Sequence, residues 1–227
     1  MTTESSPVVF LFDVDNTLLD NDRVIDDLRQ HLASAFGANE QAHYWKIFEA
    51  LQAELGYADY LGALQRYRYE NPRDPHFLKL SLFLLDYPFA ERLFPKALDV
   101  VGICRKSGLV VIVSDGDVVF QPHKIERSGL REAVEGRLLV YIHKERDLPD
   151  VERHFPARHY VILDDKPRIL AAAKKIWKDR VTTILVRQGR HAHDPRNVQP
   201  FPEPDLAVDR IGDLLLPNYR QFFDRRA

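Results

Sequence analysis

Short, unbroken runs of apolar residues recur along the chain, and they are rich in β-branched and aromatic side chains. The four clearest runs are Val8–Phe12, Val110–Val113, His159–Leu163 and Thr182–Val186. Apolar runs of this length without alternation are typical of strands that are buried on both faces, as in a parallel sheet covered by helices. Two weaker runs, Leu138–Ile142 and Leu206–Val208, are predicted to add further strands.

Stretches with apolar residues at helical spacing lie between the later strands. They are Pro95–Lys106, Pro122–Ser128, Asp147–His154 and Arg168–Lys175. Strands and helices therefore alternate along the chain. This order predicts an α/β fold with a doubly wound parallel sheet.

One long stretch, residues 21–93, contains no strand-like run. Its apolar residues recur at helical spacing, first from Ile25 to Phe36 and then from Tyr44 to Leu55, and two more helices are expected at Tyr57–Tyr69 and His76–Leu85. The stretch is too long for a simple crossover between strands. We expect an all-helical cap at 21–93, inserted into an α/β core domain formed by 1–20 and 94–227.

Composition narrows the function classes. Among 227 residues, Lys and Arg number 32 and Asp and Glu number 34, so the net charge is −2 and offers no general attraction to nucleic acid or an anionic membrane. No apolar run approaches the ~20 residues that span a bilayer, and residues 1–7 lack a signal pattern. We expect a cytoplasmic protein, a monomer or homodimer.

The single cysteine, Cys104, is expected to be a buried structural thiol.

Candidate catalytic residues follow the predicted strands. In a doubly wound sheet, ligands bind beyond the carboxyl ends of the strands, so these residues should meet at one edge. The residues in question are Asp13 and Asp15 after the first strand, Ser114, Asp115 and Gly116 after the second, Lys144 after the weak third, and Asp164 and Asp165 after the fourth. Converging carboxylates repel one another unless a cation neutralises them, and oxygen ligands favour Mg²⁺.

The sequence resembles the haloacid dehalogenase superfamily at four motifs. FDVDNT is similar to the first motif and IVSDG to the second, while Lys144, 21 residues before Asp165, and the LDD triplet are similar to the third and fourth. The order and spacing of the motifs agree with that family. The resemblance implies a Rossmann-like core with a helical C1-type cap, and a Mg²⁺-dependent hydrolase.

Carried over residue by residue, the resemblance implies a phosphatase that acts through an aspartyl-phosphate on a small phosphorylated substrate. Asp13 would be the nucleophile, Asp15 the general acid and then base, and Ser114 and Lys144 would bind the phosphoryl group. Mg²⁺ would be held by Asp13, by the main-chain carbonyl of Asp15 and by Asp165, with Asp164 behind it. The backbone amides of Val14, Asp115 and Gly116 could add to an anion-binding nest.

Several assignments have alternatives. Asp15 could be only a turn residue, Ser114 only a strand-ending cap, and a double-acid turn at Asp164–Asp165 could be functionless. The proline that usually follows the third-motif lysine is replaced by Glu145, so Lys124 is a rival to Lys144. Outside the motifs, the segment with His191, His193 and Asp194 is predicted to be a solvated loop rather than a metal site. Arg66 and Arg68 are expected to be exposed on the cap, with substrate recognition as the alternative.

Three other functions remain open. A haloacid dehalogenase would need neither the acid at Asp15 nor a metal, because halide leaves without a proton. A phosphomutase would differ only in the acceptor of the phosphoryl group. A non-catalytic binding module would be expected to lack the nucleophile or the metal-binding acid, and both are present.

Overall fold

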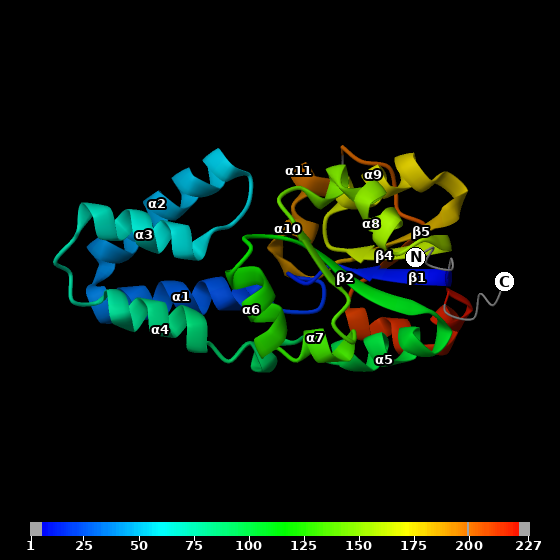
Figure 1. Ribbon diagram of the computed structural model, residues 1–227, viewed down its shortest axis with the longest axis horizontal. Helices are drawn as coiled ribbons and strands as arrows, with labels where there is room; N and C mark the ends of the chain where they lie inside the picture. Colours follow the sequence, from blue (N-terminus) through cyan, green and yellow to red (C-terminus); the bar gives the residue numbers. More distant parts are fainter. Residues whose placement is uncertain (1–5, 199, 223–227) are drawn as a thin grey trace.

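The computed structural model describes residues 6–198 and 200–222 and contains one six-stranded sheet. Its strands are β1 (Ser6–Phe12), β2 (Leu109–Asp115), β3 (Leu138–Tyr141), β4 (Ala157–Asp164), β5 (Val181–Val186) and β6 (Leu206–Val208). They lie in the order β3-β2-β1-β4-β5-β6, and every neighbouring pair is parallel (Figure 1). The predicted α/β fold with a doubly wound sheet is confirmed, and the chain changes direction across the sheet between β1 and β4.

Helices cover both faces of the sheet, because successive side chains of a strand point to opposite sides. One face carries α5 (Ala97–Ser107), α6 (Phe120–Arg127), α7 (Leu130–Ala133) and η4 (Ile211–Leu215). The other carries α8 (Leu148–His154) and α9 (Pro167–Trp177). In β1, Phe10 and Phe12 belong to the first core, and Val9 and Leu11 belong to the second. Cys104, on α5, is fully buried as predicted.

Four helices of the predicted insertion extend away from the sheet on the left in Figure 1. They are α1 (Asn21–Phe36), α2 (Ala38–Leu55), α3 (Tyr60–Glu70) and α4 (Phe77–Asp86), and the short η1 (Phe89–Arg92) follows. Side chains define two of the starts, because Asp20 accepts a hydrogen bond from the amide of Arg23 and Asp59 accepts one from the amide of Gly62. These helices begin beyond the carboxyl end of β1, where the strand-end residues lie.

The entry and exit of the insertion run side by side. The amide of Asp20 donates to the carbonyl of Arg92 (2.8 Å), and the amide of Phe94 donates to the carbonyl of Leu18 (2.9 Å). The two connections thus hold each other next to the end of β1. The helices on one side and the sheet on the other are joined through this paired segment.

The remaining elements are short. They are η2 (Lys144–Arg146), η3 (Lys178–Arg180), α10 (Gly189–His193), α11 (Pro195–Val198) and η5 (Pro217–Phe222). The prediction of a simple loop around His191 and His193 is therefore wrong, since these residues form a turn of helix. Among the residues that the structure describes, no helix combines the length and the apolar character required to cross a bilayer.

Candidate active site

The end of β1 turns sharply and directs two acids away from the strand. The carbonyl of Val14 accepts hydrogen bonds from the amides of Thr17, Leu18 and Leu19, which closes a tight turn. Within it, Asn16 has a φ of 59°, a left-handed conformation that asparagine tolerates better than most residues. The turn takes the chain out of the strand between Asp13 and Asp15, so the two side chains need not point to opposite faces of the sheet.

Asp13 is buried, and its carboxylate is held from two sides. One oxygen contacts the ammonium of Lys144, and the other accepts a hydrogen bond from the hydroxyl of Thr17 at 3.2 Å. Burial by itself raises the pKa of Asp13, but the positive charges of Lys144 and Lys166 outweigh it and keep the pKa below its usual range. Asp13 is therefore an anionic carboxylate, the form a nucleophile needs.

Lys144 is the lysine that reaches this carboxylate. Its Nζ also lies 2.7 Å from a carboxylate oxygen of Asp164 and 3.2 Å from the carbonyl of Val113. Burial lowers the pKa of Lys144, but the charges of Asp13 and Asp164 more than reverse the effect, so the amine stays protonated. The sequence placed Lys144 here on spacing alone, and the geometry agrees.

Asp164 ends β4 and Asp165 follows it, and the two acids differ in their surroundings. Asp164 pairs with Lys144 and accepts a hydrogen bond from the amide of Lys166 at 2.8 Å, although burial raises its pKa to about 6. Both carboxylate oxygens of Asp165 are buried and have no hydrogen-bond partner among the described residues. Burial raises the pKa of Asp165 well above its usual value, and the opposing charge of Lys166 does not offset it. An unpaired buried carboxylate is costly, so this residue needs a positive partner.

A cation would provide that partner. Oxygens of Asp13, Asp164 and Asp165 lie within 4.8 Å of one another, and they form the one acidic or histidine cluster of this size found in residues 6–198 and 200–222. The cluster could bind a metal ion, and all its ligands are hard oxygens. The histidines of α10 do not form a site of this kind.

Asp15 contacts different residues from Asp13. Its carboxylate lies 2.5 Å from the ammonium of Lys124, a residue of α6 that is only 1% exposed, and 3.4 Å from the amide nitrogen of Gln121. Gln121 also donates a hydrogen bond to the buried hydroxyl of Ser114 at 2.8 Å. Lys124 was a rival to Lys144 on sequence grounds. In the structure the two lysines contact different acids, Lys144 the carboxylate of Asp13 and Lys124 that of Asp15.

Asp115 and Gly116 are engaged within the protein. Asp115 accepts a hydrogen bond from the amide of Lys144 at 2.7 Å and lies 3.5 Å from the guanidinium of Arg168. The amide of Gly116 donates to the carbonyl of Tyr141 at 3.0 Å and extends the pairing of β2 with β3. The Gly116 amide is therefore committed to the sheet, contrary to its predicted part in an anion nest.

A pocket of about 480 Å³ lies over these residues and is lined by both the core and the insertion. The core contributes Asp15, Lys124 and Asp165, and α1 and α2 contribute Arg29 and Trp45. Sequence reasoning missed Arg29 and Trp45, because nothing local marks them. His191, beside the pocket, is half-buried, and burial lowers its pKa.

The two arginines singled out in the sequence lie elsewhere. Arg66 pairs with Glu54 at 2.9 Å on the surface of the insertion, and Arg68 is exposed. Neither lines the pocket. Arg68 is exposed as predicted, whereas Arg66 is half-buried.

Comparisons with known proteins agree with this architecture. The family model of haloacid dehalogenase-like hydrolases matches residues 8–186. A crystal structure of a haloacid dehalogenase-like hydrolase from Burkholderia xenovorans shares 60% identity and a TM-score of 0.86, covering 91% of this chain and 96% of that one. The chain belongs to the haloacid dehalogenase-like hydrolases.

More distant structures share the fold alone. The L-2-haloacid dehalogenase from Xanthobacter autotrophicus is 17% identical, with a TM-score of 0.58 and coverage of 91% and 96% of the two chains. The HAD-hydrolase YfnB from Bacillus subtilis, solved with magnesium, is 16% identical, with a TM-score of 0.60 and coverage of 92% and 96%. None of the curated proteins matches the sequence.

Proposed function

We propose that this hydrolase is a Mg²⁺-dependent phosphatase that acts on a small phosphorylated metabolite through an aspartyl-phosphate on Asp13. The observation that carries the proposal is the pairing of two features around one pocket. Asp15 supplies a second acid two residues after the nucleophile, and Asp165 presents a buried carboxylate without a partner. Phosphoryl transfer uses both features, whereas displacement of a halide needs neither a proton donor nor a cation.

The acidic cluster fits a magnesium ion. Asp165 and Asp13, with the main-chain carbonyl of Asp15, would hold it, while Asp164 would support the cluster through Lys144 and the amide of Lys166. Bound there, the ion would neutralise part of the charge on the phosphoryl oxygens. Of the two acids, Asp165 is the one with neither carboxylate oxygen in an ion pair or hydrogen bond among the described residues.

In the first step, a carboxylate oxygen of Asp13 attacks phosphorus, and the bond from phosphorus to the ester oxygen breaks. Lys144 and the hydroxyl of Ser114 stabilise the charge on the phosphoryl oxygens. Asp15, in its protonated form, gives its proton to the departing alkoxide. Lys124 and Gln121 hold Asp15 at the pocket for this role.

In the second step, a water molecule attacks the phosphorus of the aspartyl-phosphate. Asp15, now a carboxylate, accepts the proton of that water, and the bond between phosphorus and Asp13 breaks to release inorganic phosphate. Lys124, 2.5 Å from this carboxylate, holds it beside the pocket in this step as well. The same residue thus serves as acid and then as base.

We further propose that residues 21–93 act as a cap over a core made of 1–20 and 94–227. The pocket has walls from both parts, and its volume of about 480 Å³ suits a metabolite rather than a macromolecule. The near-neutral charge of the chain supports a small-molecule substrate over nucleic acid.

The deciding experiment measures both steps on one preparation. The protein should release nitrophenol from 4-nitrophenyl phosphate with Mg²⁺ and lose this activity with chelator. Asp15→Asn should give a burst of nitrophenol and then a slow phase, because phenolate leaves without help while the water is no longer activated. Release of chloride from 2-chloropropionate without Mg²⁺ would contradict the phosphatase assignment. Transfer of phosphate to a sugar hydroxyl in place of release would indicate a phosphomutase.

A further inference from the structure

Two buried polar groups on the insertion side of the pocket have hydrogen-bonding capacity that the described residues leave unfilled. The Nε of Arg29, on α1, is buried and makes no hydrogen bond with the described residues. The hydroxyl of Tyr60, at the start of α3, is also buried, and the side chain of Asn21 is the one polar group among the described residues that interacts with it as a hydrogen-bonding neighbour. Both residues line the pocket that contains Asp15 and Asp165. Buried polar groups are nearly always hydrogen-bonded, so two such donors in one pocket indicate a ligand that accepts from both.

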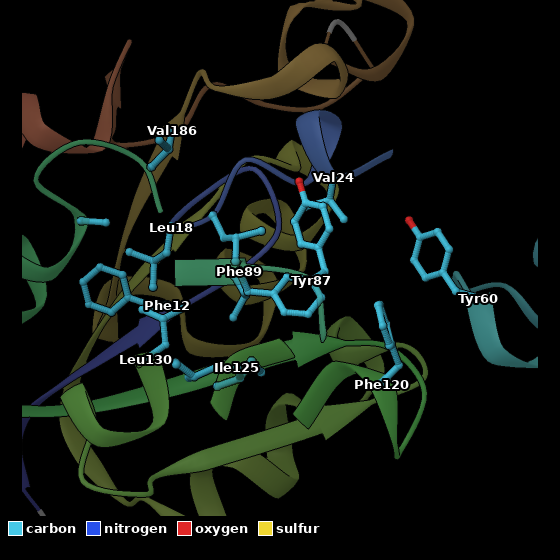
Figure 2. Close-up of a cluster of buried hydrophobic side chains, with 14 of the residues drawn as sticks. Phe12, Leu18, Val24, Tyr60, Tyr87, Phe89, Phe120, Ile125, Leu130 and Val186 are labelled. Atoms are coloured by element: carbon cyan, nitrogen blue, oxygen red, sulfur yellow. The ribbon is translucent and has the colours of Figure 1, made fainter. Parts of the chain in front are cut away.

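Aromatic rings fix the position of both groups. The guanidinium carbon of Arg29 lies 4.3 Å from the ring centroid of Trp45, so the indole covers one face and leaves the N–H edge for a ligand. The ring of Tyr60 stacks on Phe48 with centroids 4.8 Å apart and leans on Phe120 of α6 at 5.3 Å. Figure 2 shows Tyr60 and Phe120 next to each other where the insertion meets the core.

Tyr60 acts as a donor. Burial and the nearby carboxylate of Asp15 raise its pKa well above the usual value, with Asn21 acting in the opposite direction, so the phenol keeps its proton. Arg29 contributes a guanidinium cation. The two residues therefore offer one positive charge and at least two donors, an N–H and an O–H. A ligand that binds both must supply acceptors.

The surrounding charges select the kind of anion. Asp22 and Glu49 line the same pocket, and their negative charges oppose a second dianionic phosphate. A carboxylate carries a single charge, and its two oxygens match the fork of a guanidinium. Three other pocket cations are already paired, Lys124 with Asp15, Arg168 with Glu145 and Arg190 with Asp26. The fourth, Lys166, lies on the core side of the pocket, next to the charges of Asp165 and Asp13.

We propose that Arg29 and Tyr60 form a subsite for a carboxylate of the substrate, so that the enzyme acts on small phosphorylated hydroxy acids. The inference rests on the proposed phosphatase function, since the reacting phosphoryl group lies at Asp13. Arg29 and Tyr60 determine specificity and take no part in the chemical step.

Binding of two inert analogues tests the subsite without turnover. 3-Phosphonopropionate carries a carboxylate, and propylphosphonate carries a methyl group in its place. Titration calorimetry with Mg²⁺ should show the wild type binding 3-phosphonopropionate at least about tenfold more tightly. Arg29→Met should weaken that ligand about 10- to 100-fold, the usual loss of a hydrogen bond to a charged group. Propylphosphonate should bind to Arg29→Met within about twofold of the wild type, because it lacks the group that Arg29 binds.

Matched variants exclude indirect effects. Arg66→Met makes the same change at a surface position of the insertion and should leave both affinities unchanged. Tyr60→Phe removes one oxygen atom from a stacked ring and should weaken binding of 3-phosphonopropionate but not of propylphosphonate. It provides the test if Arg29→Met fails to fold. Equal affinity of the wild type for both analogues, or equal weakening of both by Arg29→Met, would overturn the subsite.

The same preparations separate this inference from the function on which it rests. If 4-nitrophenyl phosphate is hydrolysed and neither analogue binds, or the wild type binds both alike, the carboxylate subsite is wrong and the phosphatase assignment stands. If the carboxylate preference is present but no phosphate ester is hydrolysed, the subsite stands and the phosphatase assignment is wrong.

Discussion

Replacing Asp165 with Asn should stabilise the protein when no divalent cation is available, although it removes a residue of the active site. Both oxygens of this carboxylate are buried without a partner, and the charges of Asp13 and Asp164 lie nearby. Burial therefore holds the pKa of Asp165 well above its usual value. An amide of the same shape has no charge to desolvate and no repulsion from the neighbouring acids.

The size of the effect follows from the cost of such groups. On folding, the Asp165 carboxyl must either take up a proton or stay charged without a partner, which costs about 1–3 kcal/mol, whereas an amide does neither. For a chain of this length each kcal/mol shifts the melting temperature by about 2–4 °C, so Asp165→Asn should melt about 2–12 °C higher in EDTA. Bound Mg²⁺ at a hundred times its Kd would add about 2.7 kcal/mol to the wild type alone, and the difference should close or reverse.

Asp164→Asn is the matched control, because it makes the same chemical change one residue away. Asp164 is already paired with Lys144 and with the amide of Lys166, and removal of one partner of a buried ion pair costs about 3–5 kcal/mol. This variant should melt below the wild type with or without Mg²⁺. Calorimetry of the three proteins in EDTA and in excess Mg²⁺ gives the comparison. An Asp165→Asn variant that is less stable in EDTA, or that responds to Mg²⁺ as the wild type does, would refute the reasoning.

Three further expectations are simpler to measure. Asp13→Asn should lower the rate of phosphate release by at least about 10³, the scale of other lost nucleophiles, and more than a tenth of wild-type activity would deny it that role. Lys124→Met should lower kcat on alkyl phosphates by about tenfold or more, within the range of general acid–base catalysis, because Asp15 loses its closest partner. Asp205 accepts hydrogen bonds from the amide and hydroxyl of Thr183, and these, with a neighbouring lysine, lower its pKa although burial raises it. Its contribution to stability is therefore present above the ordinary pKa of 3.8 and is lost as pH falls through the folded value. Urea unfolding should show Asp205→Asn to be less stable by about 1 kcal/mol at neutral pH, with the difference vanishing in strong acid.

The strands could be predicted from the sequence because burial on both faces leaves an uninterrupted apolar run. Even the weak run at 138–142 forms β3, at the edge of the sheet, where its side chains are only partly buried. Helix boundaries were harder. Tyr57 was expected inside a helix, but the helix begins at Tyr60, because the side chain of Asp59 caps it. The turn of helix at 189–193 was hidden by the glycine and proline around it.

In the candidate site, too, some contacts could be predicted from the sequence and others could not. Asp13, Lys144 and Asp164 lie at or just beyond the carboxyl ends of parallel strands. Because these ends must meet, the contact of the three residues could be anticipated from order alone. Contacts that depend on how helices pack against the sheet or against one another could not be anticipated. The pairing of Lys124 with Asp15 depends on how α6 packs, and the positions of Arg29 and Tyr60 depend on how the insertion folds over the core. The Gly116 amide was misjudged because pairing of β2 with β3 continues one residue beyond the strand.

The contacts of Lys124 link the acid to the insertion. Its ammonium has two acceptors, the carboxylate of Asp15 at 2.5 Å and the side-chain oxygen of Asn21 at 3.3 Å, and Asn21 is the first residue of α1. Any tilt of α1 moves one of the two groups that hold this buried ammonium. The position of Asp15 therefore depends on the position of the insertion, although Asp15 itself belongs to the core. If Asp15 is the general acid, as we propose, an insertion that lines the pocket and also positions Asp15 couples enclosure of the substrate to proton transfer.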